Sequence, residues 1–299
     1  MNKTLPYWRS LLYVPANNER FTAKAGERGA DAVILDLEDS VPPAQKADAR
    51  EGAIGAIDAL AGAPCDVLVR INSPLRLAVR DLEAVVRPGL TGLLLPKTAT
   101  AGSLAALDAV VSEIEEEAGM MLGSVVFVPV IETPDALFEA RAIAKASPRN
   151  VALLLGSEDM ATECGFTPSG ETLMQPKLQL AYAAKAAGLL ALGLLDTVAA
   201  ISELDRSVEV ARRSARFGFD GATCVHPGMI PILNAAFAPG EEEVDLARRT
   251  LAAMEAAWAE GKGAARLDGR MIDMPMITRS KATLAKWERA ERRQRGEPA

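Results

Sequence analysis

The chain carries a set of acidic and basic residues whose types and positions could hold a metal ion. Each lies at or just after the end of a short apolar run, and together they comprise six carboxylates and two cations: Asp36, Glu38, Asp39, Glu132, Glu158 and Asp159, with Arg70 and Lys97. Crowded carboxylates repel one another and need a cation between them. Oxygen ligands without imidazole or thiolate select a hard divalent ion, so this set favours Mg²⁺ before Mn²⁺ or Ca²⁺.

Other metal-binding residue types are scarce. His226 is the only histidine, and the three cysteines, Cys65, Cys164 and Cys224, lie far apart in the sequence. These counts exclude an HExxH zinc site, a two-histidine metal triad and a thiolate zinc site, and they indicate no disulfide framework. The cysteines are typical of buried apolar positions in a protein of a reducing compartment.

Each candidate also has a purely structural interpretation. Glu132 could cap the helix that follows it, and Asp159 could be a helix N-cap. Arg70 could form only a structural salt bridge to the neighbouring acids. Lys97 could be a solvated loop lysine, and His226 could be a structural histidine. The residues alone leave these alternatives open.

The elements that must position these groups are eight short apolar runs, at 10–14, 32–37, 66–71, 92–95, 125–131, 151–155, 189–195 and 221–225. The runs are nearly continuously apolar rather than alternating, which is typical of parallel strands covered on both faces. The segments between them favour helices, for example at 103–118 and 177–187, and the seventh run fits a helix end equally well as a strand.

Eight such units in succession indicate an α/β fold, a (β/α)₈ TIM barrel rather than an open doubly wound sheet. No GxGxxG motif follows the first run, which disfavours a dinucleotide-binding fold. In a barrel of this class the chemistry lies at the C-terminal ends of the strands. We therefore expect the charged residues that follow the runs to converge on one mouth.

We expect the barrel domain to span residues 1–238 and a C-terminal helical extension to span 239–299. A charged amphipathic helix is expected at 241–260, and glycines at 261 and 263 break it. The segment LDGRMIDMPMI follows, and a basic helix is expected at 278–295. Its charge pattern alone is typical of a solvated surface helix.

Composition limits the possible partners. The chain has 299 residues, 49% of them apolar, and a formal net charge of −7, which disfavours nucleic-acid binding. The N-terminal segment MNKTLPYWRS has no apolar run of signal-peptide length, and no segment approaches the ~18 apolar residues of a membrane span. We expect a cytoplasmic protein with no nucleic-acid or membrane partner.

Several motifs resemble those of one family. They are RSLLYVPANNER, ILDLEDSV, VRIN, LLLPK, VIET, GSED, CVHP and DGRMIDMP, which recur in this order from Arg9 to Ile277. The chain thus resembles the citrate lyase beta subunit and malyl-CoA lyase family of the HpcH/HpaI aldolase–citrate lyase superfamily. The resemblance implies a (β/α)₈ barrel, a homotrimer or homohexamer, and Mg²⁺-dependent cleavage or formation of a carbon–carbon bond in a 3-hydroxyacyl-CoA. Mn²⁺ could replace Mg²⁺, and coenzyme A would be part of the substrate.

The resemblance also implies roles for individual residues. Arg70 matches the family's substrate-binding arginine, and its fixed charge would stabilise the enolate that forms on the thioester oxygen. Glu132 and Asp159 match the two metal ligands. Asp273 in MIDMP matches an acid that closes over a neighbouring subunit's site and protonates the enolate. The flanking Met271, Ile272, Met274 and Met276 are expected to make apolar docking contacts.

Further members of the site are expected beside these. We expect Asp39 to take part in catalysis with Arg70 and Asp273. We expect Asn72, Lys97 and Glu132 to contact the substrate together with Arg70.

The sequence departs from the family pattern at two places. Ala16 stands where many members have glycine, and Gly193 stands where an aspartate is expected, in an atypical segment at 189–198 that leaves the acyl group undetermined. Alternative functions remain open: an acyl-CoA thioesterase on the same scaffold, a lyase subunit acting on an acyl-carrier protein, a non-catalytic subunit, or a pyruvate-type aldolase without coenzyme A. The MIDMP segment argues against the last.

Overall fold

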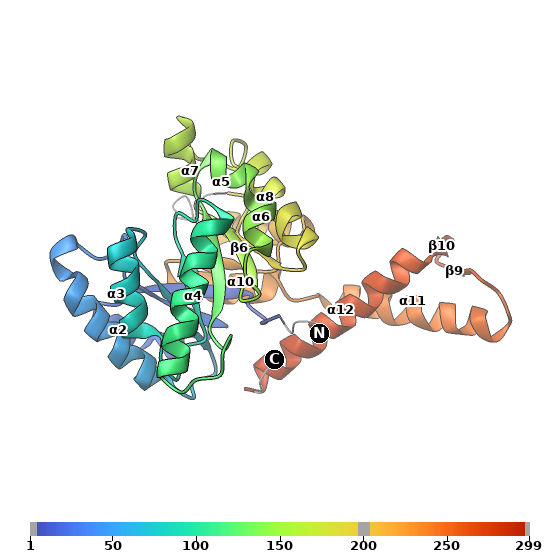
Figure 1. Ribbon diagram of the computed structural model, residues 1–299. Coiled ribbons are helices and arrows are strands. Elements are labelled where there is room, and N and C mark those ends of the chain that lie inside the picture. Colours follow the sequence, from blue (N-terminus) through green and yellow to red (C-terminus); the bar gives the residue numbers. More distant parts are fainter. Residues whose placement is uncertain (1–4, 197–203, 297–299) are drawn as a thin grey trace. The chain divides into compact units, whose positions relative to one another are not determined.

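The computed structural model describes residues 5–196 and 204–296, and the chain divides into two compact units, Met1–Phe237 and Ala238–Ala299 (Figure 1). The first unit contains eight parallel strands: β1 (Ser10–Pro15), β2 (Ala32–Asp36), β3 (Asp66–Arg70), β4 (Gly92–Leu95), β5 (Val126–Ile131), β6 (Ala152–Leu155), β7 (Leu190–Leu192) and β8 (Ala222–Cys224). Their order in the sheet is β7-β6-β5-β4-β3-β2-β1-β8. A parallel bridge between Leu192 and Gly221 joins the two ends. The predicted TIM-barrel fold is confirmed.

The described helices of this unit follow the strands in the expected alternation. They are α1 (Glu19–Thr22), α2 (Lys46–Leu60), α3 (Leu75–Val85), α4 (Ala101–Glu117), α5 (Pro134–Phe138), α6 (Ala140–Lys145), α7 (Ser157–Cys164), α8 (Met174–Ala186), α9 (Leu204–Arg216) and α10 (Ile230–Ala236), with 3₁₀ turns at Ala25–Arg28, Pro43–Gln45 and Pro227–Met229. Helix α4 begins two residues before the expected 103, because Thr100 accepts a hydrogen bond from the N–H of Ser103 and caps it. The expected helix at 177–187 is α8. Strand β7 confirms the strand interpretation of the seventh run, although it is short.

Alternate residues along each strand face opposite sides of the sheet and belong to two separate apolar cores. Side chains such as Leu35 and Val69 pack with residues of the surrounding helices. The neighbouring residues on the same strands, such as Ile34 and Leu68, belong to a second apolar cluster. This cluster contains no residue of those helices, and it forms the barrel interior. Because the side-chain period of a strand is two, Asp36 follows Ile34 and Arg70 follows Leu68 onto the inner face. The same spacing places Tyr13, after Leu11, and Glu132, after Val130, at the mouth.

The second unit is a helical hairpin of α11 (Glu241–Ala259) and α12 (Met274–Gln294), joined by a ribbon of β9 (Ala265–Leu267) and β10 (Arg270–Ile272). Its small core contains Met254, Ile272 and Ile277. Helix α12 begins before the expected 278, because the Asp273 carboxylate accepts a hydrogen bond of 3.0 Å from the N–H of Met276 and caps the helix. In the part of the chain that the structure describes, no helix has both the length and the apolar character needed to cross a membrane.

Candidate active site

Arg70 is held at the mouth by several partners. Its Nε and Nη2 donate to the two carboxylate oxygens of Asp36 at 2.7 Å each. Its Nη1 lies 3.0 Å from Glu38 Oε2 and 3.4 Å from Asp39 Oδ2, and the guanidinium carbon lies 4.9 Å from the centroid of the Tyr13 ring. Burial acts to raise the pKa of Asp36, but the hydrogen bonds and charge of Arg70 outweigh it and hold that pKa below its usual value. The salt bridge of the structural interpretation is therefore present, and it orients a permanent cation at the mouth.

Glu132 follows β5 and is nearly buried, with 3% of its surface exposed. Its Oε2 accepts a hydrogen bond of 2.5 Å from the backbone N–H of Lys97. Burial, assisted by the charges of Glu38 and Asp159 and opposed by the Lys97 N–H, raises the pKa of this carboxyl to about 7. Glu132 caps no helix, since Thr133 provides the cap of α5. The structural alternative for Glu132 is thus excluded.

The side chain of Glu132 packs directly against the backbone of Gly156. A Cβ atom at position 156 would meet Glu132 Oε1 at 2.5 Å, so only glycine leaves room for this carboxylate. Gly156 is also the residue before α7, so it provides the N-cap position of the helix that carries Asp159. Both carboxylates therefore depend on the backbone at Gly156.

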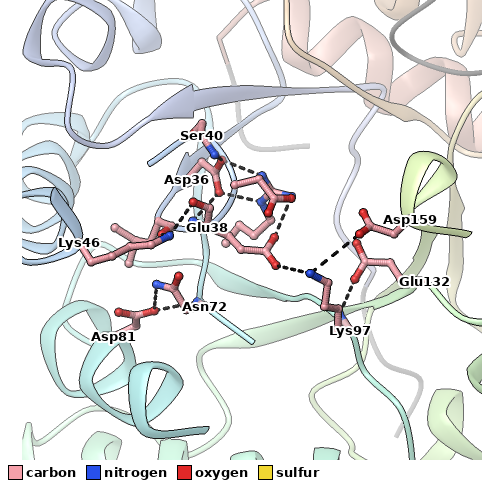
Figure 2. Close-up of polar contacts among 12 residues, drawn as sticks. Asp36, Glu38, Ser40, Lys46, Asn72, Asp81, Lys97, Glu132 and Asp159 are labelled. Carbon is pink, nitrogen blue, oxygen red and sulfur yellow. Dashed lines mark hydrogen bonds and ion pairs between the residues drawn. The ribbon is translucent and has the colours of Figure 1, made fainter. Parts of the chain in front are cut away.

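Asp159 and Lys97 complete the group (Figure 2). Asp159 is the third residue of α7 rather than its N-cap, which excludes the capping interpretation. The Lys97 Nζ lies 3.9 Å from Asp159 Oδ1 and 3.7 Å from Glu38 Oε1. Figure 2 shows Lys97 between the labelled carboxylates of Glu38 on one side and Asp159 and Glu132 on the other. Lys97 is thus paired with acids and is not simply a solvated lysine.

Arg70, Glu132 and Asp159 line a cavity of about 910 Å³ at the mouth of the barrel. The lining residues that carry charge are Arg28, Asp36, Asp39, Arg70, Glu132, Glu158 and Asp159. Apolar side chains, among them Phe21, Val130 and Leu154, form much of the remaining wall. A cavity of this size and composition is typical of a small-molecule site with a few polar groups that fix the orientation of the ligand.

The donor set fits a magnesium ion. Glu132 and Asp159 offer carboxylate oxygens, and the mutual repulsion of these acids is what a divalent cation would relieve. Among residues 5–196 and 204–296 no group of three or more His, Cys, Asp or Glu residues is arranged to hold a metal. Mg²⁺ usually takes one or two protein carboxylates and fills its remaining positions with water and substrate oxygens, so two ligands suffice.

Asn72 and Asp273, both predicted site residues, lie outside the cavity lining. Asn72 is buried, and both its backbone N–H and its Nδ2 donate at 2.7 Å to Asp81 Oδ2, which directs it toward α3 rather than into the cavity. Asp273 lies in the second unit, as the cap of α12. His226 lines the cavity, while its Nδ1 accepts a hydrogen bond of 3.1 Å from the N–H of Gly228.

Two residues of the site, Tyr13 and Gly156, were not predicted from the sequence. Tyr13 lies beneath Arg70, and its place two residues after Leu11 on an inward-facing strand was a signal that could have identified it. Gly156 accommodates Glu132 through a contact between two strands, and nothing in its local sequence indicates that contact.

We expect Gly156→Ala to displace Glu132 and to weaken Mg²⁺ binding by about tenfold, within the range usual for residues that orient metal ligands. Isothermal titration calorimetry with Mg²⁺ measures the effect. Gly102→Ala is the matched control, because the nearest atom to its new Cβ lies 3.9 Å away. Equal Mg²⁺ affinity in the two variants would contradict the packing argument.

Several known proteins are similar to this chain in sequence and in fold. The HpcH/HpaI aldolase/citrate lyase family profile matches residues 9–227. The beta subunit of citrate lyase from Escherichia coli is 35% identical over 284 residues, covering 94% of this chain and 93% of that protein. A (3S)-malyl-CoA thioesterase from Cereibacter sphaeroides is 33% identical and covers 94% of this chain and 95% of its own.

A solved structure gives the same result. The CitE protein of Mycobacterium tuberculosis, in complex with magnesium, acetoacetate and coenzyme A, superposes with a TM-score of 0.74 at 30% identity, covering 95% of this chain and 99% of that one. The expected resemblance is confirmed over nearly the whole length. The chain belongs to the HpcH/HpaI aldolase/citrate lyase family.

Proposed function

We propose that this protein is a Mg²⁺-dependent carbon–carbon lyase that cleaves or forms a 3-hydroxyacyl-CoA thioester, giving a 2-oxo acid and acetyl-CoA. The observation that carries the proposal is that one cavity is lined by the permanent cation of Arg70 and by the carboxylate pair of Glu132 and Asp159. The CitE protein solved with magnesium, acetoacetate and coenzyme A supports the choice of ligands.

Glu132 and Asp159 would hold the Mg²⁺ ion. When bound there, Mg²⁺ supplies Lewis acidity and a template for the oxygens of the 2-oxo acid. Glu132 must be ionised to act as a ligand, and the N–H of Lys97 favours that state by donating to its Oε2.

Arg70 would stabilise the negative charge that grows on the thioester oxygen as the carbon–carbon bond breaks. Asp36 binds two of its nitrogens, so Nη1 is the nitrogen available for exchange. In the structure, Nη1 contacts Glu38 and the exposed Asp39. The contact to Asp39 is the longer one, and it is the contact that an arriving substrate oxygen would replace. Asp39 therefore acts by exchanging with the substrate on Arg70.

Asp273 would donate the proton to the enolate, from the second unit of a neighbouring subunit in a homotrimer or homohexamer. Its carboxylate is exposed, and Met271 and Met274 on either side are 67% and 58% exposed, which suits docking to another surface. Ile272 was expected to join them, and this prediction is wrong: Ile272 is buried in the core of its own unit, because β10 packs it between the helices.

A second candidate is an acyl-CoA thioesterase, because a relative of nearly the same length is a (3S)-malyl-CoA thioesterase. In that reaction water attacks the thioester carbonyl and the carbon–carbon bond stays intact. Both reactions need the same carbonyl beside Arg70, so the products distinguish them. A lyase subunit that takes its acyl group on a carrier protein is the other variant, since several relatives are beta subunits of citrate lyase.

The test is product analysis. Purified protein with Mg²⁺ is incubated with malyl-, citramalyl- and citryl-CoA, and the products are identified by mass spectrometry. We expect acetyl-CoA and a 2-oxo acid in equal amounts from one of the three thioesters. Free coenzyme A without a 2-oxo acid would instead indicate the thioesterase, and no turnover of any free thioester would favour the carrier protein.

A further inference from the structure

Lys97 has an unusual backbone conformation. It follows β4 and has a φ of 49°, in the left-handed region that residues with side chains rarely adopt. The turn is held by Thr98, whose N–H donates to Val130 O at 3.2 Å and whose hydroxyl donates to Leu95 O at 2.7 Å. This conformation directs the Lys97 N–H at Glu132 Oε2. The backbone of Lys97 thus positions one of the two proposed metal ligands.

The side chain of Lys97 turns to the other proposed ligand. Its Nζ lies 3.9 Å from Asp159 Oδ1 and 3.7 Å from Glu38 Oε1, and Asp39 and Glu132 add to the negative potential around it. At these distances the contacts are between charges rather than hydrogen bonds. The side chain is 45% exposed, so the ammonium is free to shift when the charges around it change.

An ammonium in this position acts in opposite directions on two ligands. It repels a divalent cation that binds at Glu132 and Asp159, and it attracts the carboxylate of a 2-oxo acid that binds beside that cation. Removing the positive charge therefore strengthens binding of the metal alone and weakens binding of the anion to the metal-loaded protein. A change in local packing would weaken both.

We propose that Lys97 is a resident counter-ion of this site: its ammonium offsets the acids in the metal-free protein, lowers the affinity for the divalent cation alone, and raises the affinity for the substrate carboxylate. Cation and anionic substrate are thereby retained together. The proposal rests on the metal site of the proposed function. It assigns Lys97 to the binding balance of the site in addition to the substrate contact expected from the sequence.

The test measures two binding equilibria in three variants. Mn²⁺ binding is followed by electron paramagnetic resonance, and pyruvate binding to the protein at saturating Mg²⁺ is followed by calorimetry. We expect Lys97→Met to bind Mn²⁺ roughly tenfold more tightly and pyruvate roughly tenfold more weakly, the scale of one charge acting across a few ångströms of solvated surface. Both changes should shrink in 0.5 M KCl, where exposed charges are screened.

Two further variants separate charge from conformation. Lys97→Gly also removes the ammonium but suits the left-handed backbone, so it should match Lys97→Met. Lys97→Arg keeps the charge and should stay near the wild-type affinities. Unchanged Mn²⁺ affinity in Lys97→Met, or a loss of affinity for both ligands in Lys97→Met and Lys97→Gly, would overturn the proposal. Wild-type Mn²⁺ binding that is insensitive to Glu132→Gln would instead overturn the metal site itself, and the proposal with it.

Discussion

Treatment with EDTA is expected to abolish turnover, and added Mg²⁺ is expected to restore it. Glu132 and Asp159 lie at the ends of successive strands, and their mutual repulsion leaves the site short of positive charge without a divalent ion. Arg70 and Lys97 cannot supply Lewis acidity at the 2-oxo acid, because a guanidinium or ammonium group donates hydrogen bonds but has no vacant orbital to accept an oxygen lone pair. The measurement is the initial rate with the thioester that the product analysis identifies.

Substitution of either proposed metal ligand should reduce turnover, as removal of the metal does. We expect Glu132→Gln and Asp159→Asn each to cost on the order of 10²-fold or more in kcat/KM, because each removes one of two protein ligands. Asp135→Asn is the control, since Asp135 is an exposed acid in the first turn of α5, the helix that follows Glu132. Full turnover in a metal-stripped sample would refute the assignment.

The pH dependence gives an independent measurement of the same site. Burial raises the pKa of Glu132 to about 7, so its carboxyl binds a proton as the pH falls through that value. A metal ligand must be deprotonated, and protons therefore compete with the ion. The Mg²⁺ affinity should fall progressively below about pH 7 and change little above it.

Asp273→Asn should retain the fold, the oligomer and Mg²⁺ binding but cost on the order of 10²-fold or more in turnover, the usual scale for loss of a general acid. Asparagine is as good a helix cap as aspartate, and its side-chain oxygen can still accept from the N–H of Met276. The stability of α12 is thereby separated from the chemistry. Asp268→Asn is the control, because Asp268 is an exposed acid on the same ribbon, where it pairs with Arg249.

Mixing two inactive proteins tests whether the acid comes from a neighbouring subunit. Asp273→Asn lacks the acid, and Arg70→Lys lacks the planar cation that Asp36 orients with two hydrogen bonds. In mixed oligomers some sites receive an intact barrel from one chain and an intact Asp273 from another, so part of the activity should return. No rescue after proven subunit exchange would mean that the acid acts within its own chain, or not at all.

The fold could be predicted because a succession of eight apolar runs identified all eight strands, and the charged residues at the ends of these runs indicated where the site lies. Arg70, at the end of β3, and Glu132, directly after β5, lie on the inward face, whereas their roles were predicted from the family resemblance. The seventh run was ambiguous because its sequence, rich in alanine, leucine and glycine, fits a helix end equally well, and only Leu190–Leu192 of it forms a strand. Part of the atypical segment at 189–198 lies outside the described residues.

The remaining features depend on contacts between distant residues, so local patterns could not predict them. Asn72 has the position of a mouth residue, but Asp81 of α3 binds both of its donors and holds it below the surface. The left-handed turn at Lys97 directs its N–H at Glu132, which follows another strand, and nothing in the local sequence indicates this contact. Similarly, Ile272 is buried because the ribbon folds back on α11, which the methionine-rich sequence around it does not reveal.

The packing of Glu132 on Gly156 has a consequence for descent. Glu132 and Gly156 are expected to be inherited as a pair, since neither can change alone without cost. A lineage that acquires any side chain at 156 must abandon or relocate the acid, and with it the inherited chemistry. The glycine, inert in itself, therefore predicts which descendants retain the ancestral activity and which have been released to evolve another.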